Sequence, residues 1–136
     1  MTITTKKFAY LAPIVLRFSL AIVVLWFGTS QILHQEMWMG LIPDWAMNLS
    51  GLSAGTIVRM NGIFELIAGS MLVLGILTQW AALLLSAHLF VITIHLGLEP
   101  DGVRDFGLSF AMLALALFGD DVWTIFPRRN TDSVPQ

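Results

Sequence analysis

Four long apolar stretches constrain the fold of this chain more than any other feature. They cover residues 11–33, 57–77, 79–98 and 103–123. Each provides the ~20 residues that an α-helix needs to cross ~30 Å of hydrocarbon. A single segment inside lipid can satisfy its own backbone hydrogen bonds only as a helix. The sequence therefore predicts an all-α, polytopic membrane protein, built as a bundle of four transmembrane helices.

The composition agrees with a chain surrounded by a lipid bilayer. Charged residues make up 12% of the sequence, about half of the ~25% that is typical of soluble domains. The net charge of -2 and the lack of a basic run give no indication of nucleic-acid binding. The chain has no cysteine, which excludes disulfides, thiolate metal sites and covalently attached haem.

Turn and cap residues set the expected limits of these helices. Ser53 and Thr56 are candidate N-caps of the second helix, and Asp101 is a candidate N-cap of the fourth. Gly75 and Thr78 indicate a tight hairpin between the second and third helices. The only long connection, 34–55, contains Trp38, Pro43 and Trp45, and it is expected to lie on the membrane surface.

The distribution of lysine and arginine predicts the orientation. Basic residues precede the first helix and follow the fourth, whereas the two opposite loops are mainly acidic. By the positive-inside rule, residues 1–10 and 127–136 are cytoplasmic segments on either side of a transmembrane domain, 11–126. The expected location is the cell (inner) membrane.

Two ionisable residues fall at one depth near the middle of the membrane. From the helical rise, Glu65 lies roughly 12 Å below the outer surface and His88 roughly 13 Å below it. A charge at this depth costs ~2.5–3.5 kcal/mol, so both side chains should face the interior of the bundle. With Asn61 on the same helix as Glu65, they form a candidate intramembrane polar site. The alternative is a structural pair whose two members satisfy each other.

Other polar residues are expected at the two ends of the bundle. Within roughly 3 Å of the outer boundary lies a second level, the candidate outer gate of a pocket that opens outward, formed by Arg59, His95, Arg104 and Asp105. The two arginines could instead extend to lipid headgroups. Arg17 lies roughly 9 Å from the cytoplasmic side and is interpreted as an inner buried charge. Close helix packing is expected at Gly62, Gly69, Gly107, Ala111 and Ala114.

Several short patterns, taken in order, resemble the DoxX family of four-helix membrane proteins. They extend over Val15 to Ile125 and comprise Arg17 with Leu25-Trp26-Phe27-Gly28, Gly62-Ile63-Phe64-Glu65 with Gly69, Gly75-Ile76-Leu77-Thr78, Arg104-Asp105 and Gly119-Asp120. Gln31 departs from the pattern, since many relatives have a lysine near this point. The resemblance implies an association with quinone-linked redox enzymes, because some relatives act with a quinol oxidase or with thiosulfate:quinone oxidoreductase.

The sequence leaves three functions open. In the first, Glu65 and His88 serve as acid–base groups toward a quinone headgroup, and a membrane redox partner supplies the electrons. In the second, the protein is a non-catalytic accessory or small-molecule-binding subunit that stabilises a partner complex. The third is a haem held by His34 and His95; no site for a single metal ion is expected, because His88 and His95 lie roughly 10 Å apart. Whether the chain is an enzyme, and whether it forms a homo-oligomer, is not decided.

Overall fold

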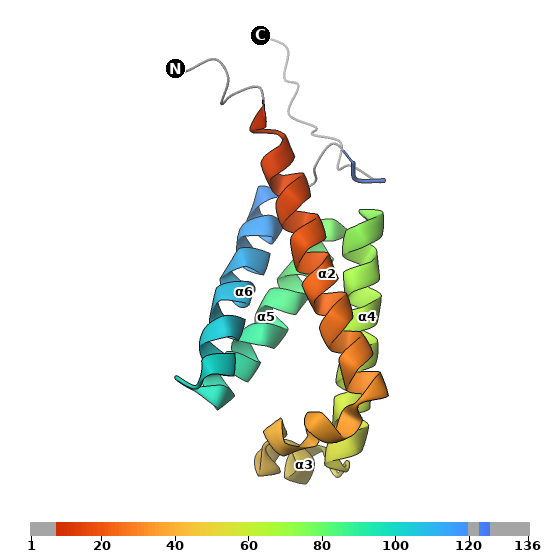
Figure 1. Ribbon diagram of the computed structural model, residues 1–136, viewed down its shortest axis with the longest axis vertical. Helices are drawn as coiled ribbons and strands as arrows, with labels where there is room; N and C mark the ends of the chain where they lie inside the picture. Colours follow the sequence, from red (N-terminus) through yellow and green to blue (C-terminus); the bar gives the residue numbers. More distant parts are fainter. Residues whose placement is uncertain (1–7, 120–122, 126–136) are drawn as a thin grey trace.

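The computed structural model describes residues 8–119 and 123–125, and this part of the chain is helical without any β-strand (Figure 1). The predicted all-α fold is therefore confirmed. Four long helices run alternately in opposite directions, and a short helix with two 3-10 turns lies at one end (Figure 1). In chain order the elements are α2 (Leu11–Leu33), η1 (Gln35–Met37), η2 (Met39–Leu41), α3 (Asp44–Ser50), α4 (Ala54–Leu74), α5 (Thr78–Leu96) and α6 (Pro100–Phe118).

Within the described residues, α2, α4 and α5 are long and apolar enough to cross a membrane. The fourth long helix, α6, is 19 residues long, as α5 is. It differs from α5 in carrying three charged residues among its first six, Asp101, Arg104 and Asp105. The remainder of α6 is apolar except for Ser109. The chain is thus a multi-pass membrane protein whose fourth helix combines a charged beginning with an apolar body.

Local capping explains where α4 begins and ends. The side chain of Ser53 accepts a hydrogen bond from the Thr56 backbone N–H, so α4 begins at Ala54 rather than at residue 57. It ends at Leu74 because Gly75 adopts a φ of 67°, a left-handed conformation that glycine takes without steric cost. Of the two cap candidates in the sequence, Ser53 is the one that caps.

The limits of α6 differ from those expected. This helix begins at Pro100, and proline is favoured in the first turn because its missing N–H is not needed there. Asp101 therefore lies inside the first turn instead of capping it, so that expectation is wrong. The helix ends at Phe118, five residues before the expected position, and Trp123 lies outside it.

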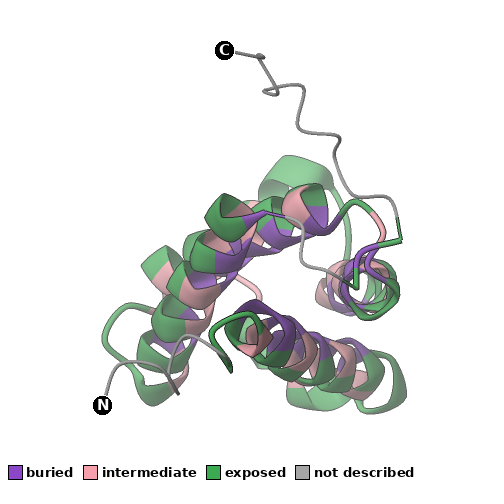
Figure 2. Cartoon of the chain, turned by 90° about the horizontal axis from the view of Figure 1, so that it is seen from above, coloured by how far each residue is buried: buried purple, intermediate pink, exposed green. Residues whose placement is uncertain are grey.

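The four long helices form two pairs, α2 with α4 and α5 with α6, and contacts between the pairs are fewer than contacts within them. Buried residues lie on the sides of the helices that face one another, and the outward sides are exposed (Figure 2). The outward sides carry many large apolar side chains, as expected where lipid covers a protein. The shared core consists of Leu20, Ala21, Val24, Ala68, Leu72, Ala81, Ala82, Leu85, Leu89, Met112 and Leu115.

Glycines let α2 and α4 approach closely. A Cβ added at Gly28 would lie 2.8 Å from the Gly62 carbonyl oxygen, and one at Gly62 would lie 2.9 Å from the Gly28 carbonyl oxygen. A Cβ added at Gly69 would lie 3.0 Å from the side chain of Leu25. The expected packing role of Gly62 and Gly69 is therefore present, and the partner glycine on α2 is Gly28.

The small residues of α6 do not follow the same expectation. A Cβ at Gly107 would meet no atom of residues 8–119 or 123–125 within 4 Å, and Ala114 is exposed, so neither makes a close helix contact there. Ala111 is half-buried against the core. The packed face of α6 instead consists of Gly102, Asp105, Ser109, Met112 and Leu115. These positions recur at helical spacing and therefore lie on one side of the helix, the side toward α5.

Candidate functional site

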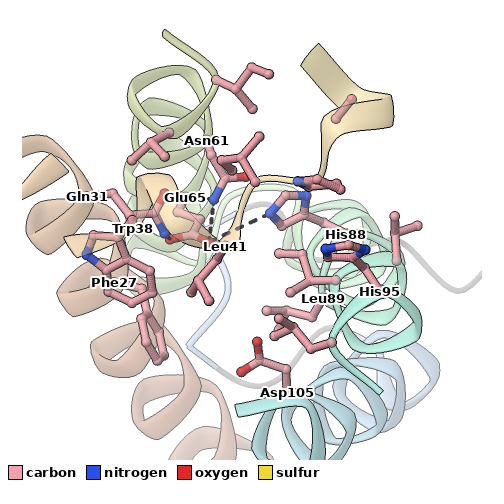
Figure 3. A pocket seen from close by; sticks show the side chains of 18 of the residues that line it. Phe27, Gln31, Trp38, Leu41, Asn61, Glu65, His88, Leu89, His95 and Asp105 are labelled. Carbon is pink, nitrogen blue, oxygen red and sulfur yellow. Dashed lines mark hydrogen bonds and ion pairs between the residues drawn. The ribbon is translucent and has the colours of Figure 1, made fainter. Parts of the chain in front are cut away.

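A cavity of about 240 Å³ lies between the two helix pairs, in the half of the bundle next to α3 (Figure 3). All four long helices contribute to its walls, and the connection from η1 to α3 adds Trp38, Leu41, Ile42, Pro43, Trp45 and Ala46. Most of the lining is apolar or aromatic. Its polar groups are few, which is the usual composition of a site that binds a largely apolar molecule in one orientation.

Three polar side chains of α2 and α4 hold one another at the wall of this cavity. Glu65, which is 4% exposed, accepts a hydrogen bond at Oε2 from Gln31 Nε2 over 2.9 Å. Asn61 Nδ2 donates to Glu65 Oε1 over 3.2 Å and to Gln31 Oε1 over 2.7 Å. The carboxyl group of Glu65 is therefore fixed in place by two amide donors, inside a largely apolar bundle.

His88 faces this group from α5 (Figure 3). Its Nε2 lies 3.7 Å from Glu65 Oε1, which is longer than a hydrogen bond. The same nitrogen is buried and has no hydrogen-bond partner among the described residues. The imidazole ring is held edge-on against Phe64, with the ring centroids 5.1 Å apart. Glu65 and His88 thus point toward each other in the interior, with a polar nitrogen left unsatisfied between the two helix pairs.

The beginning of α6 brings further charges to the cavity. Asp105 is 5% exposed and accepts a hydrogen bond at Oδ1 from Arg104 Nε over 2.8 Å. Arg104 also binds Asp101 Oδ1 through Nη1 at 2.8 Å. The guanidinium carbon of Arg104 lies 4.7 Å from the centre of the Phe27 ring, a cation–π contact that joins α6 to α2. Arg104, Asp105 and His95 all line the cavity.

Two residues expected near this group lie elsewhere. Arg59 is exposed, donates to Gln35 Oε1 over 3.2 Å and does not line the cavity. The structure therefore separates Arg59 from the other three residues of the outer gate. His34 is exposed just after α2 and does not line the cavity that His95 lines. Among the described residues, no three histidine or acidic side chains are placed to hold a metal ion together.

Arg17 lies toward the opposite end of the bundle and has no part in the cavity. It is 1% exposed, and its Nη1 donates to the carbonyl oxygens of Leu72 at 2.6 Å and Val73 at 3.3 Å. These carbonyls belong to the last turn of α4, where the helix itself provides no donors and carries partial negative charge. The guanidinium group also lies over the Phe18 ring, 4.7 Å from its centre. Arg17 therefore fixes the end of α4 to α2.

A scan against protein-family models matches the DoxX model to residues 12–97, more than half of the chain. The chain belongs to the DoxX family. No curated protein and no solved structure matches it. The family match covers α2, α4 and α5, and so includes every member of the cluster around Glu65. Arg104 and Asp105 lie beyond the match, on α6, so these two residues are tied to the site by geometry alone.

Gln31 is the main site residue of this DoxX-family protein that sequence reasoning did not include. Helical side chains lean toward the N-terminus of their own helix. In the antiparallel pair α2 and α4, Gln31 and Glu65 therefore lean toward each other on either side of the Gly28–Gly62 contact. A polar residue near the end of a transmembrane helix, one turn after a glycine, is the signal that could have identified Gln31.

Proposed function

We propose that this DoxX-family protein binds a membrane quinone or quinol in the cavity and works beside quinone-dependent redox enzymes of the cell (inner) membrane. The observation that carries the proposal is the buried Nε2 of His88, which has no hydrogen-bond partner in the described part of the chain and faces the Glu65 carboxyl group at 3.7 Å. A buried polar atom without a partner is costly in a protein interior. A ligand oxygen that hydrogen-bonds to it would remove this cost.

The surrounding groups suit a quinone headgroup in particular. The ring is apolar on both faces and carries two oxygens, so it needs apolar walls and a small number of polar contacts. His88 Nε2 is the donor for one oxygen, and Glu65 is a nearby acceptor for the hydroxyl proton of the reduced form. Imidazole and carboxyl groups are the side chains that most often exchange protons in such roles. The electrons for any reduction or oxidation come, in this proposal, from a partner enzyme.

The orientation belongs to the same proposal. With both termini in the cytoplasm, the end of the bundle that holds α3 and the cavity lies in the outer half of the membrane. The ligand would then exchange protons on the outer side. The basic residues near both ends of the chain and the acidic loops between helices support this arrangement.

Quinone binding to the purified full-length protein in lipid nanodiscs tests the proposal. We expect His88→Ala to weaken binding by about tenfold or more, since a hydrogen bond to a buried group is worth ~1–3 kcal/mol. His34→Ala is the matched control, because this histidine is exposed and does not line the cavity, and it should bind as the wild type does. Circular dichroism of both variants verifies folding. Equal affinity of His88→Ala and wild type would refute the role of His88.

One observation favours a second candidate function, a non-catalytic accessory subunit that stabilises a partner complex. Gln31, Asn61 and Glu65 already satisfy one another without any ligand, as a purely structural cluster would. Deletion of the protein distinguishes the two functions. An accessory subunit predicts less of the partner enzyme but unchanged quinone turnover per remaining complex, whereas a quinone site predicts lower turnover per complex.

A further inference from the structure

A second hollow lies on the bundle surface beside the cavity. It is lined by Trp45 of α3 and by Val91, Ile94 and His95 of α5, with a volume of about 390 Å³. Three of these four residues, Trp45, Val91 and His95, also line the cavity. The hollow and the cavity are therefore neighbours that share one wall, at the edge where α3 meets α5. We call this second hollow the α3–α5 groove.

The cavity is too small for a whole membrane quinone. Sites for drug-sized ligands usually have volumes of ~300–1,000 Å³, and the cavity has about 240 Å³. That space suits one substituted ring. A long isoprenoid or alkyl chain attached to the ring has to leave the bundle between two of its elements.

Individual contacts join the long helices to one another at several points around the cavity. The α2–α4 seam is closed where Gly28 meets Gly62, and the α4–α5 seam by the packing of Phe64 on His88. The cation–π contact of Arg104 closes the gap between α6 and α2.

Helices α5 and α6 pack closely on each other, and Ser86 Oγ donates a hydrogen bond to the Ser109 carbonyl oxygen over 2.8 Å. The α3–α5 groove shares residues with the cavity, and its surface is mainly apolar and open. Ile94 is 69% exposed, and Trp45 and Val91 are each 55% exposed.

We infer that the ligand is a ring headgroup on a long apolar chain, and that the chain leaves through the α3–α5 groove into the bilayer. The inference rests on the proposed function. It implies that the ligand enters sideways from the lipid rather than from water. Because the chain has apolar surroundings before and after binding, the groove provides a passage and adds little affinity of its own.

The test compares two probes in the full-length protein in phosphatidylcholine nanodiscs: the benzoquinone headgroup ring alone, and the same ring with a decyl chain. Ile94→Trp fills the groove from the one groove residue that does not itself line the cavity. Ile22→Trp on α2 is the matched control, because Ile22 is similarly exposed at 66%. We expect Ile94→Trp to weaken binding of the decyl probe about tenfold and to leave binding of the ring probe unchanged. Ile22→Trp should change the binding of neither probe.

Four results would overturn the inference or its basis, and they are distinguishable. Unchanged binding of both probes to Ile94→Trp would show that the chain leaves elsewhere. An equal loss of affinity for both probes in Ile94→Trp would show that the groove is not a separate passage. In either case the wild type still binds quinone, and the proposed function stands. Failure of the wild type to bind either probe would instead refute the proposed function. A photoreactive group on the chain should also label Trp45 or α5 and not α2; labelling of α2 would contradict the inference.

Discussion

The contact between Gly28 and Gly62 gives the sharpest test of how the bundle is built. A methyl group at position 62 would lie 2.9 Å from the Gly28 carbonyl oxygen and 3.1 Å from both Gln31 Cβ and Ile32 Cγ1. The carbonyl oxygen belongs to the backbone of α2 and cannot rotate away. Ordinary contact begins at 3.4 Å, so the two helices would have to move apart by about 0.5 Å, which is 3.4 less 2.9.

The expected energy combines two opposing effects. Overpacking of a tight contact costs ~1–3 kcal/mol, whereas replacing glycine by alanine inside a helix gains up to ~1 kcal/mol. Gly107→Ala isolates the second effect, because a Cβ there meets nothing within 4 Å. We therefore expect Gly62→Ala to be less stable than Gly107→Ala by ~1–3 kcal/mol, with Gly107→Ala at or above the wild type.

Reversible unfolding in mixed micelles, followed by circular dichroism, measures this difference. Moving α2 away from α4 should also disturb the cavity wall, because Gln31 on α2 and Glu65 on α4 are joined by a hydrogen bond of 2.9 Å. Quinone affinity should therefore fall in Gly62→Ala and stay at the wild-type value in Gly107→Ala. If the two alanine variants were equally stable, the close packing of α2 on α4 would be refuted.

Three further predictions concern other parts of the molecule. Arg17→Met should lower the free energy of unfolding by ~2–4 kcal/mol, because charged hydrogen bonds to the end of α4 are lost inside the bundle; chemical unfolding that matched the wild type would contradict this. Ser86→Ala removes the bond to the Ser109 carbonyl and should cost only ~0.6–1.7 kcal/mol in the same assay, as membrane hydrogen bonds do; a larger loss would show a further role for Ser86. Since the chain has no cysteine, single-cysteine variants report topology: a membrane-impermeant thiol reagent should label Asn48→Cys and not Tyr10→Cys in intact cells, and the reverse pattern would invert the proposed orientation.

Depth along the membrane normal could be predicted from the sequence because it depends on few variables. The limits of an apolar stretch and a fixed rise per residue place each polar group. This reasoning put Glu65 and His88 at one level, and the high cost of a charge facing lipid turned both inward. The structure brings their side chains to 3.7 Å. Their role in binding stays a prediction.

Position around the bundle could not be predicted in the same way. In a membrane helix the side that faces lipid and the side that faces protein are both apolar, so hydrophobic periodicity does not identify the packed face. This explains why Gly107 was assigned to an interface that it does not join. It also explains Arg59, which has a depth suited to the outer gate but lies outside the cavity.

The polar site is divided between the two helix pairs, and this has a consequence for stability. Glu65 and its two amide donors belong to the α2–α4 pair, whereas His88 and Asp105 belong to the α5–α6 pair. Hydrogen bonds hold Glu65 and Asp105 each within its own pair, whereas Glu65 and His88 approach each other across the boundary at 3.7 Å. A ligand that bonds to both would tie the pairs together.

Binding at this boundary should therefore raise the stability of the whole bundle and not only fix the ligand. A ligand specific for the folded state stabilises it by ~2.7 kcal/mol at one hundred times its dissociation constant. The decyl quinone should accordingly raise the melting temperature of the wild type. It should do so much less in His88→Ala, because that variant keeps the cluster of Gln31, Asn61 and Glu65 but lacks the contact from the other pair. An equal rise in both proteins would mean that the ligand binds within one pair, and that the boundary between the pairs is not where it is held.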